Sequence, residues 1–214
     1  MWYNILAGIF VTSDLCSTII CGKFIDIPLF GFGEFATPAG TFVYPVTFLI
    51  SDIITEVYGQ HKAKTVVIMS FCSTVYMFAI INIIDNLQIA SCSLLQTLEF
   101  SKVFHLSSMN FIASSIAFLF SQFLDIKIFS LLKSYMPGRY LWLRNGVSTI
   151  TAQIIDTLIF FFILTVMGVL PVSIFWTVFL STIFIKIIWA ILDTPLFYLS
   201  VFFLKHLDKN NLEY

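Results

Sequence analysis

The sequence predicts an all-α, polytopic membrane protein with six transmembrane helices. Only 11% of the 214 residues are charged, whereas soluble proteins average about 25%. The mean hydropathy is +0.97, and a soluble protein of this size could not cover so much apolar surface with polar groups. The chain also contains six apolar stretches of about 20 residues or more, the length that a helix needs to cross a bilayer.

The six spans are bounded by glycine, proline or charged residues. Gly59 stops the second span, Pro171 closes the fifth, and Pro195 inside the sixth predicts a kink or a broken end. The predicted spans are Tyr3–Gly22, Ala39–Gly59, Ala63–Asp85, Leu106–Leu132, Asn145–Leu170 and Val172–Leu204. Since no linker separates them, we expect residues 1–214 to form a single integral membrane domain.

Lysine and arginine in the short connections predict the orientation. Those on one side are Lys62, Lys64, Lys133, Arg139, Arg144, Lys205 and Lys209, and those on the other are Lys23 and Lys102. Both termini are therefore expected on the cytoplasmic side of the cytoplasmic (inner) membrane. The apolar connection from Ile25 to Phe35, with Gly31 and Gly33, is expected to lie on the outer membrane interface, and a lid that dips into the membrane is the alternative.

Composition and motifs exclude several classes of function. The net charge of −1 provides no basic patch for nucleic acid. The four cysteines form no CxxC pair, so we expect neither a metal site nor a cofactor. HExxH, GxSxG and phosphate-binding glycine loops are missing from the sequence. An enzyme with catalytic residues is therefore not expected.

Ionisable residues within the predicted spans are the main functional signal. Each costs at least about 2.5–3.5 kcal/mol at the centre of a bilayer. They are Asp14, Asp52, Glu56, Asp125, Lys127, Asp156, Lys186 and Asp193. We expect these side chains to face one another, water or a ligand instead of lipid. Because the acids outnumber the two lysines, the surplus acids require protons, water or a cationic or donor-rich substrate.

Spacing places most of these residues on shared helical faces. Residues three, four or seven apart lie on one side of a helix. The pairs are Asp52 with Glu56, Gln122 with Asp125, Gln153 with Asp156, and Lys186 with Asp193. An internal ion pair between Lys186 and an aspartate is the alternative to a ligand role for that lysine. The similarity of Ser51–Thr55 to Ala152–Asp156 is a weak indication of a three-plus-three inverted repeat.

The segment Tyr44–Gly59 strongly resembles the signature of the queuosine precursor transporter family, a branch of the vitamin uptake transporters. Further matching segments are Ser121–Asp125, Trp142–Asn145, Ala152–Asp156, Lys186 and Asp193–Pro195. The resemblance implies import of 7-cyano-7-deazaguanine, 7-aminomethyl-7-deazaguanine or queuine for salvage into tRNA. It implies a small-molecule substrate and the lipid bilayer as partners, with no direct contact to nucleic acid. The resemblance leaves open whether the protein forms a homodimer.

The matched positions give the expected site. The substrate-binding residues are predicted to be Asp52, Glu56, Gln122, Asp125, Asn145, Gln153 and Asp156. Gating or ion-pair roles are predicted for Arg144, Lys186 and Asp193. An alternative is a substrate-binding subunit that docks on a shared ATP-driven module. Such subunits dock through small residues spaced four apart on the first helix, a pattern that does not follow Ala7 and Gly8 here.

Overall fold

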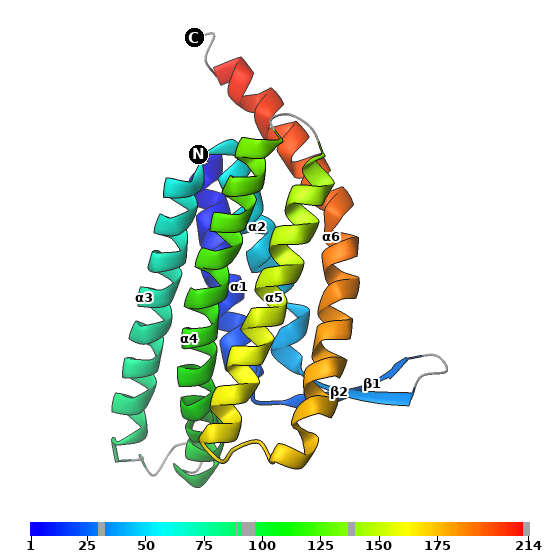
Figure 1. Cartoon of the computed structure of the whole chain (residues 1–214). Coiled ribbons are helices and arrows are strands. Elements are labelled where there is room, and N and C mark those ends of the chain that lie inside the picture. The colour runs from blue at the N-terminus through cyan, green and yellow to red at the C-terminus, as the bar shows by residue number, and fades with distance from the viewer. Residues whose placement is uncertain (30–32, 89, 91–96, 137–139, 212–214) are drawn as a thin grey trace.

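Six long helices form a bundle in the computed structural model (Figure 1), which describes residues 1–29, 33–88, 90, 97–136 and 140–211. The helices are α1 (Trp2–Ile20), α2 (Pro45–Val57), α3 (Gln60–Asp85), α4 (Thr97–Tyr135), α5 (Leu141–Val166) and α6 (Phe175–Asn211). Short 3-10 turns, η1 (Ala39–Phe42) and η2 (Val172–Ile174), precede α2 and α6. All six predicted spans correspond to helices long and apolar enough to cross a membrane.

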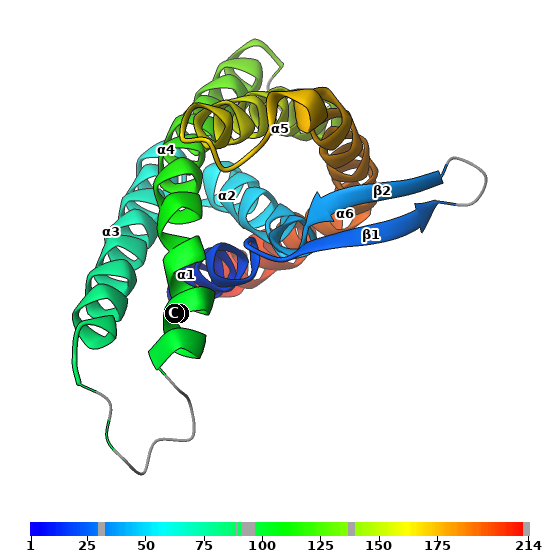
Figure 2. The same cartoon turned by 90° about the horizontal axis from the view of Figure 1, so that it is seen from below.

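Both termini lie at one end of the bundle, here called the terminus end (Figure 1). The opposite end, called the hairpin end, carries two antiparallel strands, β1 (Phe24–Leu29) and β2 (Gly33–Pro38). Seen from below, the hairpin lies across this end and extends sideways past α6 (Figure 2). The sequence analysis predicted an apolar interfacial connection here and missed the strands. Its Gly31 lies outside the described residues.

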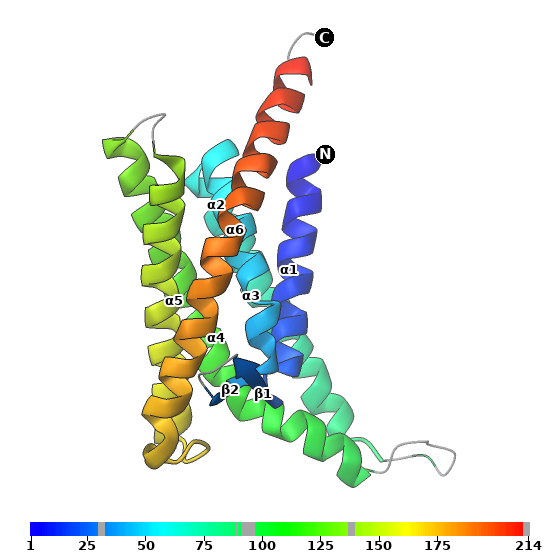
Figure 3. The ribbon, with the colours of Figure 1, turned by 90° about the vertical axis from the view of Figure 1, so that its right-hand side faces the viewer.

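The ends of the helices follow local chemistry. Pro45 begins α2, where the missing backbone N–H needs no partner. Gly59, at φ +88°, makes the turn into α3 as predicted. Helix α6 continues unbroken through Pro195 to Asn211, so the predicted broken end is absent. Instead, α6 crosses the bundle obliquely, and its last turns lean out beyond the other helices (Figures 1 and 3).

A close contact joins the hairpin end to α1. The Ser17 hydroxyl donates a hydrogen bond to the Gly40 carbonyl at 3.1 Å. A Cβ atom at Gly40 would lie 2.7 Å from the Ser17 carbonyl oxygen, so only glycine fits at this position. The Ala39 amide donates to the Lys23 carbonyl at 2.7 Å and closes the base of the hairpin. The entry to α2 is thereby held against the end of α1.

The distribution of side chains is that of a membrane protein. Large apolar residues such as Ile68, Phe120, Phe162 and Leu180 are exposed on the outside of the bundle, where lipid would cover them. Helix α2 is the most buried span and α3 the least, and α2 contacts α1, α3, α4 and α6. The interior around α2 is consequently where polar side chains gather.

One charged residue departs from the prediction that all the span charges face inward. Lys127 of α4 is exposed on the surface of the bundle. Its ammonium can reach the membrane interface along the flexible side chain, because α4 continues for only two more turns toward the terminus end. The other ionisable residues that the analysis placed within spans are buried.

Candidate functional site

The ten predicted site residues are all buried, and all except Asp193 lie at three levels along the bundle. Helix α5 carries members of every level, from Arg144 near the terminus end to Asp156 toward the hairpin end. At 1.5 Å per residue these two positions are roughly 18 Å apart along the helix. The structure therefore spreads the predicted residues along an axis and does not gather them in one pocket.

The level nearest the hairpin end is a cavity with an empty volume of about 520 Å³, part of it open to the outside. Without the open space the cavity volume is about 60 Å³, below the range of about 300–1,000 Å³ typical of small-molecule sites, so a bound base would require its walls to move apart. Its walls come from α1, η1, α2, α4, α5 and α6 and include Asp14, Thr18, Thr41, Tyr44, Phe118, Asp156, Phe160, Phe161, Thr182 and Lys186. Polar groups on one part of the wall and phenylalanine rings on another suit a flat, polar ring.

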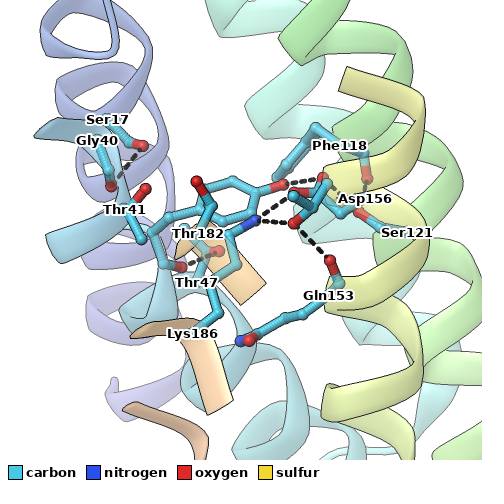
Figure 4. A network of polar contacts seen from close by, with 12 residues as sticks. Ser17, Gly40, Thr41, Thr47, Phe118, Ser121, Gln153, Asp156, Thr182 and Lys186 are labelled. Carbon is cyan, nitrogen blue, oxygen red and sulfur yellow. Dashed lines mark hydrogen bonds and ion pairs between the residues drawn. The ribbon is translucent and has the colours of Figure 1, made fainter. Parts of the chain in front are cut away.

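Asp156 is the most connected side chain in the cavity wall (Figure 4). Its Oδ1 accepts hydrogen bonds from the Tyr44 hydroxyl at 2.8 Å and the Ser121 hydroxyl at 3.1 Å. Its Oδ2 accepts one from the Lys186 ammonium at 2.7 Å. Lys186 also donates to the Thr157 hydroxyl at 2.9 Å and lies 5.0 Å from the centre of the Tyr44 ring. The ion pair joins α5 to α6, and the hydrogen bonds to Asp156 add α4 and the start of α2. Both carboxylate oxygens of Asp156 therefore have partners within the protein.

Asp14 contributes a second carboxylate to the cavity wall. Its Oδ2 accepts hydrogen bonds from the hydroxyls of Ser70 at 2.7 Å and Thr74 at 3.0 Å, both on α3. The predicted site did not include Asp14, because it is the only acid on its helix and has no partner at helical spacing. Only the packing of α1 against α3 and α4 reveals its place in the cavity.

The middle level lies deeper, between the cavity and the terminus end, and we call it the polar layer. It consists of Asp52, Gln122, Asp125, Asn145 and Gln153, each 2% exposed or less. Amide atoms of Gln122, Asn145 and Gln153 have no hydrogen-bond partner in the described part of the chain, whereas Asp52 and Asp125 interact with each other and Asp125 also with Ser148. Buried polar atoms are paired in the large majority of cases. The amide groups beside this carboxyl pair are therefore available to bind water or a ligand.

Within the polar layer, two acids lie side by side. The carboxyl groups of Asp52 and Asp125 are in direct electrostatic contact, and Asp52 also accepts a hydrogen bond from the Thr149 hydroxyl at 3.1 Å. Gln122 donates from Nε2 to the Thr47 hydroxyl at 3.2 Å. Two buried carboxyl groups at close range need a shared proton, a cation or N–H donors between them.

The third level is an ion-pair cluster at the terminus end. Glu56 Oε2 lies 3.3 Å from Arg144 Nη2 and 3.1 Å from Lys133 Nζ. Lys133 also donates to the Glu56 carbonyl at 2.8 Å, and the Arg144 guanidinium lies 5.5 Å from the centre of the Phe129 ring. The cluster joins α2, α4 and α5. Lys133, which the sequence analysis placed in a connection, belongs to the last turn of α4.

The sequence analysis placed Lys186 and Asp193 on one helical face and gave an ion pair with an aspartate as the alternative role of Lys186, and the structure contains such a pair. Lys186 binds Asp156, and Asp193 forms no ion pair with any described residue. The sequence analysis also missed the hydroxyl groups of Tyr44 and Thr157. Tyr44 is the first residue of the matched motif, and Thr157 directly follows Asp156. Their positions next to predicted residues could have identified both hydroxyl groups as candidates.

Six membrane-length helices around a polar interior define a multi-pass membrane protein of the transporter class. Residues 38–200 match the family described as "Putative vitamin uptake transporter". The chain therefore belongs to this family of vitamin uptake transporters, which are not enzymes. Over 195 residues it is 29% identical to the "Probable queuosine precursor transporter" of Bacillus subtilis (strain 168), a match covering 89% of this chain and 82% of that protein. No solved structure matches the chain.

Proposed function

We propose that this protein imports a queuosine precursor across the cytoplasmic membrane for salvage into tRNA. The candidate substrates are 7-cyano-7-deazaguanine, 7-aminomethyl-7-deazaguanine and queuine. Family membership and the Bacillus subtilis relative support the class of substrate. The observation that carries the proposal is the polar layer, where a buried pair of carboxyl groups lies among amide groups that lack partners within the described residues.

The chemistry of the polar layer fits a deazaguanine. The base has N–H donors at N1 and its 2-amino group and a carbonyl acceptor at O6. The carboxylates of Asp52 and Asp125 can accept the two N–H groups, and the amide of Gln122 or Gln153 can donate to the carbonyl. Donors placed between the two acids would also relieve their mutual repulsion. Glu56 has cationic partners instead and holds the terminus end closed.

The three levels fit alternating access. The cavity lies toward the hairpin end, whereas the Glu56–Arg144–Lys133 cluster closes the terminus end. The excess of lysine and arginine at the terminus end supports a cytoplasmic location for it. The molecule then corresponds to an outward-facing state, in which the base enters the cavity. Import requires the base to pass into the polar layer and the ion-pair cluster to separate.

Replacing Asp52 or Asp125 by asparagine is expected to reduce uptake at least about tenfold, because each substitution removes a charge-assisted hydrogen bond worth about 1.5–3 kcal/mol. The measurement is uptake of labelled 7-cyano-7-deazaguanine, with tRNA queuosine content as a second readout, in cells that cannot make the precursor.

Asp26→Asn makes the same chemical change at an exposed position on β1 and should keep normal uptake. Protein abundance in the membrane is measured for all variants. Normal uptake by both Asp52→Asn and Asp125→Asn, at equal abundance, would remove the polar layer from the substrate path.

A further inference from the structure

We propose that Asp14 determines substrate specificity by binding a cationic amino-alkyl group on the transported base. The cavity then prefers a base with such a substituent to one whose substituent is neutral. This inference rests on the proposed function and extends it to a residue outside the predicted site.

The charges of the cavity wall are unbalanced. The ionisable side chains that line the cavity in the described residues include two acids, Asp14 and Asp156, and one cation, Lys186. Lys186 is bound to Asp156 at 2.7 Å. No described lysine, arginine or histidine forms an ion pair with Asp14. A carboxylate without a cation in a low-dielectric interior is costly, so Asp14 is complementary to a positively charged ligand.

The hydrogen bonds of Asp14 orient its carboxylate for this role. The hydroxyls of Ser70 and Thr74 both donate to Oδ2, which fixes the side chain against α3. Oδ1 accepts no hydrogen bond from the described residues and remains available. An ammonium group in the cavity can donate to Oδ1 and form a charge-assisted hydrogen bond.

The rest of the wall carries groups that would contact the ring of such a ligand once the walls move apart. Phe118, Phe160 and Phe161 provide aromatic surface for a flat heterocycle. The Lys186 ammonium has three N–H groups and donates two of them, to Asp156 and Thr157. The third can donate to a ring carbonyl. A bicyclic base could thus place its carbonyl near Lys186 and its substituent near Asp14.

A purely structural role for Asp14, as a tie between α1 and α3, makes a different prediction. If Asp14 only holds α1 against α3, its replacement would weaken the binding of every substrate to a similar extent. Loss of a cation-binding carboxylate would weaken only the cationic substrate. Two probes that share one ring and differ in the charge of one substituent therefore separate the two roles.

The probes are 7-aminomethyl-7-deazaguanine, which is a cation at neutral pH, and 7-cyano-7-deazaguanine, which is neutral. Affinities are measured by calorimetry on the detergent-purified full chain. The wild type should bind the aminomethyl base at least about tenfold more tightly, as expected for one charge-assisted hydrogen bond. Asp14→Asn should lose this preference while its affinity for the cyano base changes by less than about twofold.

The matched control is Ser70→Ala/Thr74→Val, which removes the hydrogen bonds to α3 and keeps the carboxylate. It should retain the preference for the aminomethyl base, whatever its effect on thermal unfolding. Equal affinities of the wild type for the two bases would overturn the inference even if Asp14→Asn does not fold. A parallel loss of both affinities in Asp14→Asn would also overturn it. Binding of neither base by the wild type would contradict the proposed function itself.

Discussion

Lys186→Met is expected to lower the free energy of unfolding by about 3–5 kcal/mol, since it leaves the buried carboxylate of Asp156 without its cation. Both side chains of this ion pair are only 7% exposed, so little water can reach the carboxylate to replace the lost partner. The measurement is thermal unfolding of the purified protein in detergent, where a change of this size shifts the midpoint by roughly 6–20 °C.

A double-mutant cycle identifies the cause of that loss. Lys186→Met/Asp156→Asn removes both charges and keeps an oxygen that can accept hydrogen bonds from Tyr44 and Ser121. It should be clearly more stable than the sum of the single effects predicts. Lys127→Met makes the same change at the exposed lysine of α4 and should have little effect. Additive single effects, or equal effects at Lys127 and Lys186, would contradict a coupled buried pair.

Arg144→Met is expected to open the terminus end, because Arg144 is the buried cation of the cluster that closes it. The loss of a charge-assisted contact worth about 1.5–3 kcal/mol shifts a two-state equilibrium by about tenfold or more. The measurement uses Ser148→Cys as a buried reporter on α5, in a chain whose four native cysteines are replaced. A membrane-impermeant thiol reagent applied from the terminus side should label it faster in the Arg144→Met background.

Lys133→Met serves as the control for this experiment. Lys133 contacts the same Glu56 oxygen, but its side chain is 37% exposed, against 2% for Arg144. An exposed ion pair contributes only about 0–1 kcal/mol, so labelling should change little. Unaltered labelling in Arg144→Met, or a larger effect from Lys133→Met, would show that the cluster does not control access from this end.

The spans were predictable from sequence because the bilayer imposes their length and composition. Gly59 marked a helix end for reasons of backbone geometry, whereas α5 ends at Val166, before Gly168 at φ +74°, and not at Pro171. The cost of charges in lipid predicted the burial of Asp52 and Asp125. A helical repeat gives the face on which a residue lies. It does not give the neighbour that faces it.

That difference explains what the sequence analysis did not predict. The pairing of Lys186 with Asp156, and the entry of Asp14 into the cavity, depend on how α1, α5 and α6 are rotated against one another. The hairpin was missed because its apolar residues were interpreted as an interfacial connection. Two short apolar runs around the glycines at Gly31 and Gly33 are also a hairpin signal, and that signal was available.

The central claim is that this chain by itself carries a queuosine precursor across a membrane through its polar interior. The most direct measurement is uptake of labelled 7-aminomethyl-7-deazaguanine and 7-cyano-7-deazaguanine into liposomes that contain only the purified protein, with guanine as a control. The account predicts uptake of at least one deazaguanine above protein-free liposomes, and its loss in Asp52→Asn and Asp125→Asn. No uptake without an added ATP-driven module, from protein that binds the base in detergent, would contradict it and indicate a binding subunit.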